Sequence, residues 1–93
     1  MSWFVYILRC ANDSYYVGHT LNPEARFLRH RINEGAQHTA TYPPESILYR
    51  ERFNTEAEAI QREHQLKRWS RAKKEALIAG NALALRSLSR SHD

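Results

Sequence analysis

The chain has few of the residues that cross-link or bend a polypeptide: one cysteine, three glycines and three prolines in 93 residues. The single thiol, Cys10, excludes an internal disulfide, and we expect it to be a small buried apolar side chain. So few glycines leave no glycine-rich phosphate loop and no dinucleotide-binding fingerprint. The histidines and Cys10 show none of the paired spacings of zinc motifs, and no Ser-His-Asp arrangement is present.

Long hydrophobic runs are also missing. The first apolar stretch stops at Arg9, and residues 1–3 lack the basic start of a signal peptide. No run is long enough to span a bilayer. We therefore expect a cytoplasmic protein with no membrane partner, folded as one domain around a modest core.

Positive charge is what the chain has in excess. The net charge is +4, and 11 of the 14 basic residues are arginine. The planar fork of arginine suits phosphate, so this bias favours a nucleic-acid partner. A basic, soluble surface explains the charge equally well.

Two strands joined by a turn begin the chain. Residues 3–10 and 15–20 are rich in aromatic and β-branched side chains, and the first run is apolar enough to be a central strand covered on both faces. Residues 12–14 supply the turn, because Asn and Asp tolerate a left-handed conformation.

Register decides whether the two tyrosines of this hairpin meet. A three-residue loop over residues 12–14 places Tyr6 opposite Thr20 and puts Tyr6, Tyr16 and Gly18 on one face. A two-residue loop would separate the phenols. We favour the three-residue loop, in which Gly18 leaves space for a ligand beside the phenols.

The rest of the chain predicts a helix, a strand and two more helices. Asn22 and Pro23 start a helix that runs to about Asn33 or Glu34 and stops at Gly35. Its expected core stripe is Leu21, Ala25, Leu28 and Ile32, with Arg26, His30 and Asn33 on a neighbouring face.

Beyond that helix, the prolines of residues 36–46 predict a loop. A strand follows over 47–53, with Ile47, Tyr49 and Phe53 on one face. A capping box at residues 55–58 starts a helix to about Trp69. Residues 71–79 form the next helix, between a Ser70 cap and a Gly80 stop. In the tail, 81–93, a short helix can dock before the chain frays.

Glu63 is out of place. It lies between Ala59 and Leu66 in the apolar stripe of its helix, so its carboxylate must be paired or hold a cation. A buried ion pair with an arginine, or a helix rotated to expose Glu63, are the plain alternatives to a metal or catalytic role.

Other candidates are weaker from position alone. Arg26 and His30 would ordinarily be solvated helix residues, and Tyr6 and Tyr16 would be core aromatics. Basic residues also cluster around Trp69, which can stack a base or pack inward. That cluster comprises Arg62, Lys67, Arg68, Arg71, Lys73 and Lys74.

Taken together, these positions resemble a known family. Phe4-Val5-Tyr6, Tyr16-Val17-Gly18, Arg26 and Glu63 occur in the order and at the separations of the GIY-YIG endonuclease superfamily. The chain is most similar to its small stand-alone bacterial branch, and is similar to the N-terminal nuclease domain of the excision-repair C subunit. Phe4 stands in place of the usual first glycine.

The resemblance implies an α/β (α+β) fold, in which helices flank a small three-stranded antiparallel sheet. The expected order is strand-strand-helix-strand-helix-helix. It assigns residues 1–80 to the nuclease domain and 81–93 to the tail. By the same resemblance, the catalytic residues are Tyr6, Tyr16, Arg26, His30 and Glu63.

The implied activity is hydrolysis of phosphodiester bonds in DNA, with structured or single-stranded DNA of repair or recombination as candidate substrates; RNA is not excluded. Glu63 would hold a single Mg²⁺ or Mn²⁺. The expected nucleic-acid contacts are Gly18, His19, Arg29, Lys67, Arg68, Arg71, Lys73 and Lys74. The alternative function is a non-catalytic nucleic-acid-binding module, or an adaptor that assembles through Leu83, Leu85 and Leu88.

Overall fold

The computed structural model describes residues 1–32 and 42–89. Among these residues the order is strand-strand-helix-strand-helix-helix-helix, which confirms the expected α+β class. The last helix is the short one that the sequence allowed in the tail. The elements are β1 (Trp3–Cys10), β2 (Tyr15–Thr20), α1 (Pro23–Arg31), β3 (Pro44–Phe53), α3 (Glu56–Lys67), α4 (Arg71–Ala79) and α5 (Ala82–Ser89).

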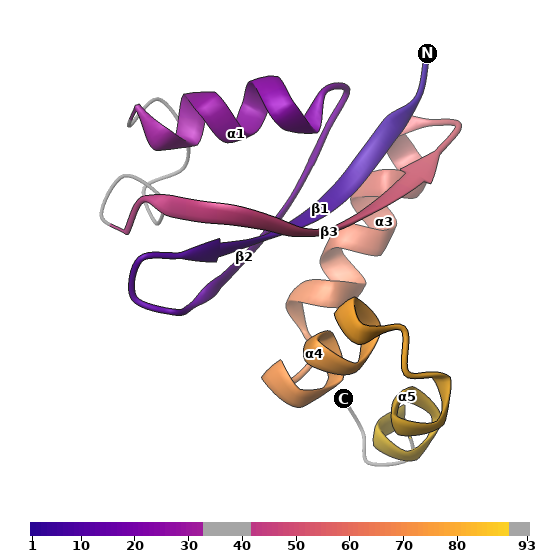
Figure 1. Ribbon diagram of the computed structural model, residues 1–93. Helices are drawn as coiled ribbons and strands as arrows, with labels where there is room; N and C mark the ends of the chain where they lie inside the picture. Colours follow the sequence, from indigo (N-terminus) through magenta and orange to yellow (C-terminus); the bar gives the residue numbers. More distant parts are fainter. Residues whose placement is uncertain (33–41, 90–93) are drawn as a thin grey trace.

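The sheet is antiparallel with strand order β2-β1-β3, so β1 is central as predicted. Helix α1 lies on one side of the sheet, and α3 and α4 lie on the other (Figure 1). This arrangement covers both faces of β1 and buries Val5, Tyr6, Ile7 and Leu8. No helix in the described part of the chain is long and apolar enough to cross a membrane.

The two faces of the sheet differ in character. Val5, Ile7 and Val17 point toward α3 and form the apolar core with its Ala59 and Leu66. The even-numbered residues point toward α1, where the rings of Tyr6 and Tyr16 meet His30. One face is therefore apolar, and the other carries hydroxyl and imidazole groups.

The β1–β2 turn has three residues, but they are 11–13 and not 12–14. The Cys10 amide donates to the Ser14 carbonyl at 2.9 Å, and the Asp13 amide donates to the Cys10 carbonyl at 2.8 Å. Asp13 takes the left-handed conformation, with φ 65°, that the last position of such a loop requires.

The register is consequently shifted from the one we expected. Tyr6 pairs with Gly18, not with Thr20, and Leu8 pairs with Tyr16. The shift is two residues, so the side-chain alternation is preserved. Tyr6 and Tyr16 share a face, as predicted.

Strand β3 departs from the prediction at both its start and its face. It begins at Pro44, which pairs with Cys10 at the end of an edge strand, where proline is tolerated. A register shift then separates two pairs: Leu8 lies opposite Ile47, whereas Ile7 lies opposite Tyr49. Because the bulge inserts a residue, Ile47 does not share a face with Tyr49 as we had expected.

Helix α1 is capped as predicted, but the face that it buries against the sheet is not the predicted one. The Asn22 side chain accepts from the Ala25 amide, and Pro23 is at the first turn. The expected core stripe is wrong: Leu28 is 61% exposed and Ile32 is 64% exposed. The helix ends at Arg31, earlier than expected, and the predicted Gly35 stop lies outside the described residues.

The buried residues of α1 are instead Pro23 and His30, with Arg26 and Phe27 half-buried. The face with Arg26 and His30, which we had expected next to the core stripe, is therefore the one that points toward the sheet. It fits there because the sheet presents tyrosine hydroxyls that an imidazole can bond.

Helices α3 and α4 follow their sequence signals closely. The Thr55 hydroxyl accepts from the Glu58 amide, and the Ser70 side chain accepts from the Lys73 amide. Gly80 ends α4 with φ 69°. Helix α3 ends at Lys67, two residues before the expected Trp69.

Candidate active site

Two tyrosines and a histidine form the centre of the candidate site on the α1 face. The Tyr6 hydroxyl lies 3.1 Å from Nε2 of His30. The ring of Tyr16 meets the His30 ring nearly edge-on, with centroids 5.1 Å apart. The ring centroids of Tyr6 and Tyr16 lie 6.4 Å apart, so the three rings form one cluster.

Gly18 makes room for this cluster. A Cβ built at Gly18 would lie 2.6 Å from Cζ of Tyr6 and still closer to its hydroxyl oxygen. We had expected the missing side chain to leave space for a ligand. The phenol of Tyr6 fills that space and thereby reaches the edge strand β2.

Burial sets the protonation of the cluster. Desolvation, together with the proximity of Tyr16, raises the pKa of Tyr6 to about 12. Desolvation, followed by the nearby charge of Arg26, lowers the pKa of His30 to about 4. At neutral pH the phenol therefore keeps its proton and the imidazole is neutral, so His30 can accept a hydrogen bond.

Arg26 brings a positive charge to these groups. It lies on the inward face of α1 and is half-buried. Burial dominates the shift of the Tyr6 pKa, while hydrogen bonding to Arg26 and the Arg26 charge oppose that rise. Arg26 thus lies close enough to the phenol cluster to interact with Tyr6.

Glu63 lies across the edge of the sheet, on α3. It is 8% exposed, as its place in the apolar stripe predicted. Its Oε1 lies 2.6 Å from Nδ1 of His19, and its Oε2 lies 2.8 Å from Nζ of Lys67. The carboxylate is thus paired, but with a histidine and a lysine and not with the arginine considered above.

Its neighbours keep Glu63 ionised. Burial acts to raise the pKa of Glu63, but hydrogen bonds from Lys67 and His19, with their charges, lower it below its ordinary value. On its other side, Nε2 of His19 lies 3.4 Å from a carboxylate oxygen of Glu56. We did not anticipate Glu56, although its place two turns before Glu63 on one helix face was the available signal.

The donor set around Glu63 fits a divalent cation in a limited way. The described residues contain no group of three histidine, cysteine or acidic side chains that could hold a metal ion. Glu63 would therefore act as a single carboxylate ligand, with oxygens of water or substrate as the others. A cation already lies at Oε2, the ammonium of Lys67, so a metal at that oxygen requires Lys67 to move.

The site straddles the edge strand β2. Tyr6, Tyr16, Arg26 and His30 lie on the α1 side, and Glu63 is on the α3 side. The charge of Glu63 still contributes to raising the pKa of Tyr6, after burial and Tyr16, so the two halves interact electrostatically. The structure thus groups all five predicted catalytic residues around one edge of the sheet.

The basic residues expected to contact nucleic acid differ in their exposure and in their partners. The guanidinium of Arg62 lies 5.1 Å from the Trp69 ring centroid, and Nζ of Lys73 lies 4.2 Å from it. Trp69 itself packs against the core, which is the inward placement we had left open. Lys73 is only 5% exposed, so little of it is available to a phosphate.

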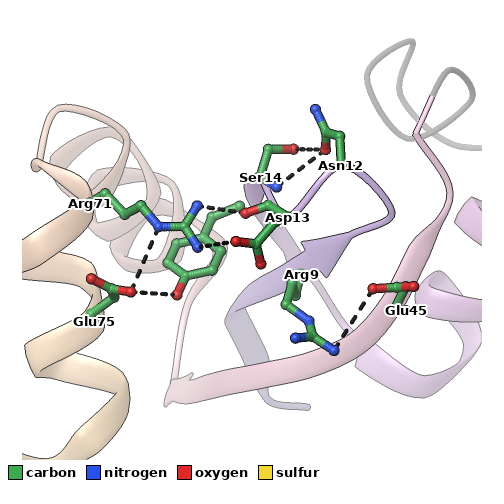
Figure 2. Close-up of polar contacts among 8 residues, drawn as sticks. Arg9, Asn12, Asp13, Ser14, Glu45, Arg71 and Glu75 are labelled. Atoms are coloured by element: carbon green, nitrogen blue, oxygen red, sulfur yellow. Dashed lines mark hydrogen bonds and ion pairs between the residues drawn. The ribbon is translucent and has the colours of Figure 1, made fainter.

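Arg71 is engaged within the fold. It donates to the Asp13 carbonyl and carboxylate and pairs with Glu75 (Figure 2). Its guanidinium carbon also lies 4.0 Å from the ring centroid of Tyr15. Arg71 links α4 to the β1–β2 turn.

Two of the expected contacts, Arg29 and Arg68, are exposed and pair with no carboxylate in the described part of the chain. Lys74 is half-buried, and desolvation followed by the charge of Arg71 lowers its pKa. Lys67 and Arg68 border a shallow depression of about 510 Å³ with Gln61 and His64 on the outer side of α3.

Comparison with known proteins identifies the family. A model of the GIY-YIG catalytic domain matches residues 2–76. The chain belongs to the GIY-YIG family. This family is a nuclease superfamily, which places the chain among nuclease-type proteins and confirms the resemblance.

Similar proteins carry a shared family name. The UPF0213 protein of Natronomonas pharaonis is 45% identical over 76 residues, which is 82% of this chain and 89% of that protein. The UPF0213 protein of Staphylococcus haemolyticus is 40% identical over 81% of this chain and 92% of its own. The solution structure of the UPF0213 protein of Bacillus halodurans has a TM-score of 0.56 at 33% identity, covering 87% and 86% of the two chains.

Proposed function

We propose that this GIY-YIG protein is a divalent-metal-dependent endonuclease that hydrolyses phosphodiester bonds in DNA. The observation that carries the proposal is the polar cluster at the edge of β2. Two phenols, a neutral imidazole and an arginine lie on one side of that edge, and a buried ionised carboxylate lies on the other. Burying polar groups is costly, and such clusters of shifted pKa values are typical of functional sites.

Arg26 supports the phosphate-binding part of the proposal. Its guanidinium can donate a forked pair of hydrogen bonds to the scissile phosphate and stabilise the negative charge that grows in the transition state. The Tyr6 hydroxyl oxygen can accept a hydrogen bond from Arg26 and so hold the guanidinium in place.

The two phenols are suited to different tasks. Tyr6 is buried, and its pKa of about 12 makes it a poor base. Tyr16 is partly exposed, so it is better placed to orient the attacking water and to take its proton. His30, neutral and bonded to Tyr6, can accept a hydrogen bond from the phenol and hold it in position.

Glu63 is the residue that would hold the metal. When bound, Mg²⁺ or Mn²⁺ supplies Lewis-acid polarisation of the phosphate and neutralises charge on the leaving oxygen. Its carboxylate is ionised at neutral pH, as a ligand for a hard cation must be.

Cleavage assays with Glu63→Ala test the proposal. The wild-type protein is expected to nick at least one of single-stranded, duplex, flap or branched DNA with Mg²⁺ or Mn²⁺. Glu63→Ala should lose at least about a hundredfold in rate while retaining DNA binding, a loss of the size typical for a key electrostatic group. Glu45→Ala removes a surface carboxylate paired with Arg9 at 3.8 Å and is the matched control. Undiminished cleavage by Glu63→Ala would refute the metal role.

A non-catalytic nucleic-acid-binding module is the second candidate. The observation that favours it is the pairing of both Glu63 oxygens within the protein, with His19 and with Lys67. It predicts DNA or RNA binding without cleavage on every substrate and with either metal ion. Repair or recombination intermediates are the DNA substrates that we expect an endonuclease to cleave and a binding module only to bind.

A further inference from the structure

The carboxylate of Glu63 has a bonding partner on each oxygen. Oε1 lies 2.6 Å from Nδ1 of His19, and Oε2 lies 2.8 Å from Nζ of Lys67. Only about a tenth of the side chain is exposed. While both partners stay in place, each oxygen already has a bonded donor and little of the side chain is open to a metal ion.

The two partners are held very differently. His19 is mostly buried, lies 3.4 Å from Glu56, and its ring contacts the Trp3 ring at 5.8 Å between centroids. Lys67 is the last residue of α3, its side chain is 49% exposed, and the described residues offer it no second carboxylate. Lys67 is therefore the partner that can leave.

The Lys67–Glu63 pair is also weak enough to exchange. It is a pair at i,i+4 on a helix, and half of the lysine is in water. Such pairs are readily broken, because solvent screens the attraction and the flexible side chain loses entropy when it is held. The ammonium is a single flexible cation that an anion outside the protein can attract.

We propose that Lys67 competes with the divalent cation for Glu63, and that a phosphate of bound DNA removes this competition by drawing Lys67 away. DNA and metal then bind cooperatively, with Lys67 as the residue that couples them. By thermodynamic linkage, each ligand raises the affinity for the other by the same factor. This inference rests on the metal role of Glu63 in the proposed function.

Charge balance supports the exchange. In the free protein the ammonium of Lys67 compensates the buried carboxylate, which would otherwise be costly. In the complex a divalent cation compensates Glu63, and the DNA phosphate compensates Lys67. Arg68 is the next residue and is exposed without a carboxylate partner among the described residues, so a phosphate drawn to this end of α3 meets two cations.

Mn²⁺ binding to the full chain tests the proposal without any measurement of cleavage. Lys67→Gln should bind Mn²⁺ about threefold to tenfold more tightly than the wild type, as expected for loss of a competing exposed ion pair. Arg52→Gln removes the same charge on the far edge strand β3, where Arg52 bonds Ser2 and does not contact Glu63, and should leave Mn²⁺ affinity nearly unchanged. Isothermal titration calorimetry gives the affinities.

The coupling is measured by repeating the titration with a phosphorothioate-linked oligonucleotide, which is anionic and resists hydrolysis. The wild type and Arg52→Gln should bind Mn²⁺ severalfold more tightly with the oligonucleotide than without it. Lys67→Gln should show a clearly smaller gain, because only the direct contribution of the phosphates to metal binding remains. Equal Mn²⁺ affinities in the two variants without DNA, or a gain in Lys67→Gln as large as that of the wild type, would overturn the proposal.

A fourth protein separates this inference from the function on which it rests. If Glu63→Ala binds Mn²⁺ as tightly as the wild type, Glu63 is not the metal ligand and both ideas fail. If Glu63→Ala loses Mn²⁺ binding but Lys67→Gln gains none, the metal site stands and only the competition by Lys67 is wrong.

Discussion

At the scale of single residues, Gly18 controls how near Tyr6 lies to the edge of the sheet. Gly18→Ala would place a methyl group within 2.6 Å of a rigid, buried ring carbon, so the ring must move. We expect a loss of about 1–3 kcal/mol in the free energy of unfolding, the usual cost of overpacking. Any cleavage activity should fall with it, because Tyr6 loses its place beside His30. Urea denaturation and a nicking assay measure the two effects.

The other described glycine with a conformational role is the matched control. Gly80 has φ 69°, and a Cβ at this position would meet no atom within 4 Å. Gly80→Ala should lose about 1–2 kcal/mol through backbone strain alone and leave nicking unchanged. If Gly18→Ala keeps full activity, Tyr6 does not need its observed position.

His30 is a second residue with a measurable signature. Its pKa is lowered to about 4, whereas the unfolded chain has the ordinary value of 6.5. Between these values the unfolded state binds more protons, so stability is full above pH 6.5 and falls as the pH drops toward 4. The expected slope from His30 is at most about 1.4 kcal/mol per pH unit.

His30→Gln, which keeps a hydrogen-bonding side chain but cannot titrate, isolates this contribution. Urea denaturation at pH 7, 6 and 5 should show a smaller loss of stability for His30→Gln than for the wild type. Parallel curves for the two proteins over this range would contradict the burial of a neutral imidazole.

At the scale of elements, a group of contacts centred on Arg71 joins α4 to the first hairpin. Figure 2 shows Arg71 reaching the turn at Asp13 while Glu75 holds its other side. Arg71→Lys keeps the charge but loses the fork and most of the stacking on Tyr15. We expect a loss of about 1 kcal/mol, because the pairs are half-exposed, and faster hydrogen exchange at the Cys10 and Asp13 amides.

The same hairpin provides the control. Arg9 makes one ion pair with Glu45, at 3.8 Å (Figure 2). Arg9→Lys should change neither stability nor amide exchange appreciably. Equal effects of the two substitutions would mean that Arg71 contributes only its charge.

Local signals predicted the elements well, and packing decided what they could not. Asn22, Thr55, Ser70 and Gly80 act as caps where the sequence placed them, because a cap depends on a few neighbouring residues. The inward face of α1 was predicted wrongly. Hydrophobicity pointed to the leucines, whereas the partner face of the sheet carries the polar ends of Tyr6 and Tyr16.

At the scale of the whole molecule, much of the positive charge is already used within the fold. Arg9, Arg50, Arg62, Lys67 and Arg71 all take part in ion pairs with carboxylates. Among the described residues that leaves few cations near the site, chiefly Arg26, Arg29 and Arg68, with Lys67 if it is released. About 2–4 phosphate contacts predict a slope of roughly −2 to −4 for log K against log salt concentration.

Fluorescence anisotropy with a labelled oligonucleotide across a sodium chloride series gives this slope. Arg29→Gln should make the slope shallower by about 1, and Arg52→Gln, on the far edge strand and bonded to Ser2, should not. A slope steeper than about −6 would mean that the paired arginines leave their carboxylates to bind DNA.

The site could be predicted residue by residue but not in its arrangement. The place of Glu63 in an apolar stripe showed that its carboxylate is buried, and alternation showed that Tyr6 and Tyr16 share a face. That the site wraps around the edge of β2 depends on how α1 and α3 pack on opposite faces. The pairing of His19 with Glu63, 44 residues apart, has no local signal at all.

The close approach of Tyr6 to Gly18 has a consequence for how such a protein can evolve. The two positions share one volume, so neither can grow by a substitution unless the other shrinks. Substitutions at the two positions are therefore expected to occur together. A lineage that abandoned the chemistry would be free to exchange the bulk, with a small residue at position 6 and a large one at 18. The sizes of these two residues therefore record whether the catalytic arrangement has been kept under selection.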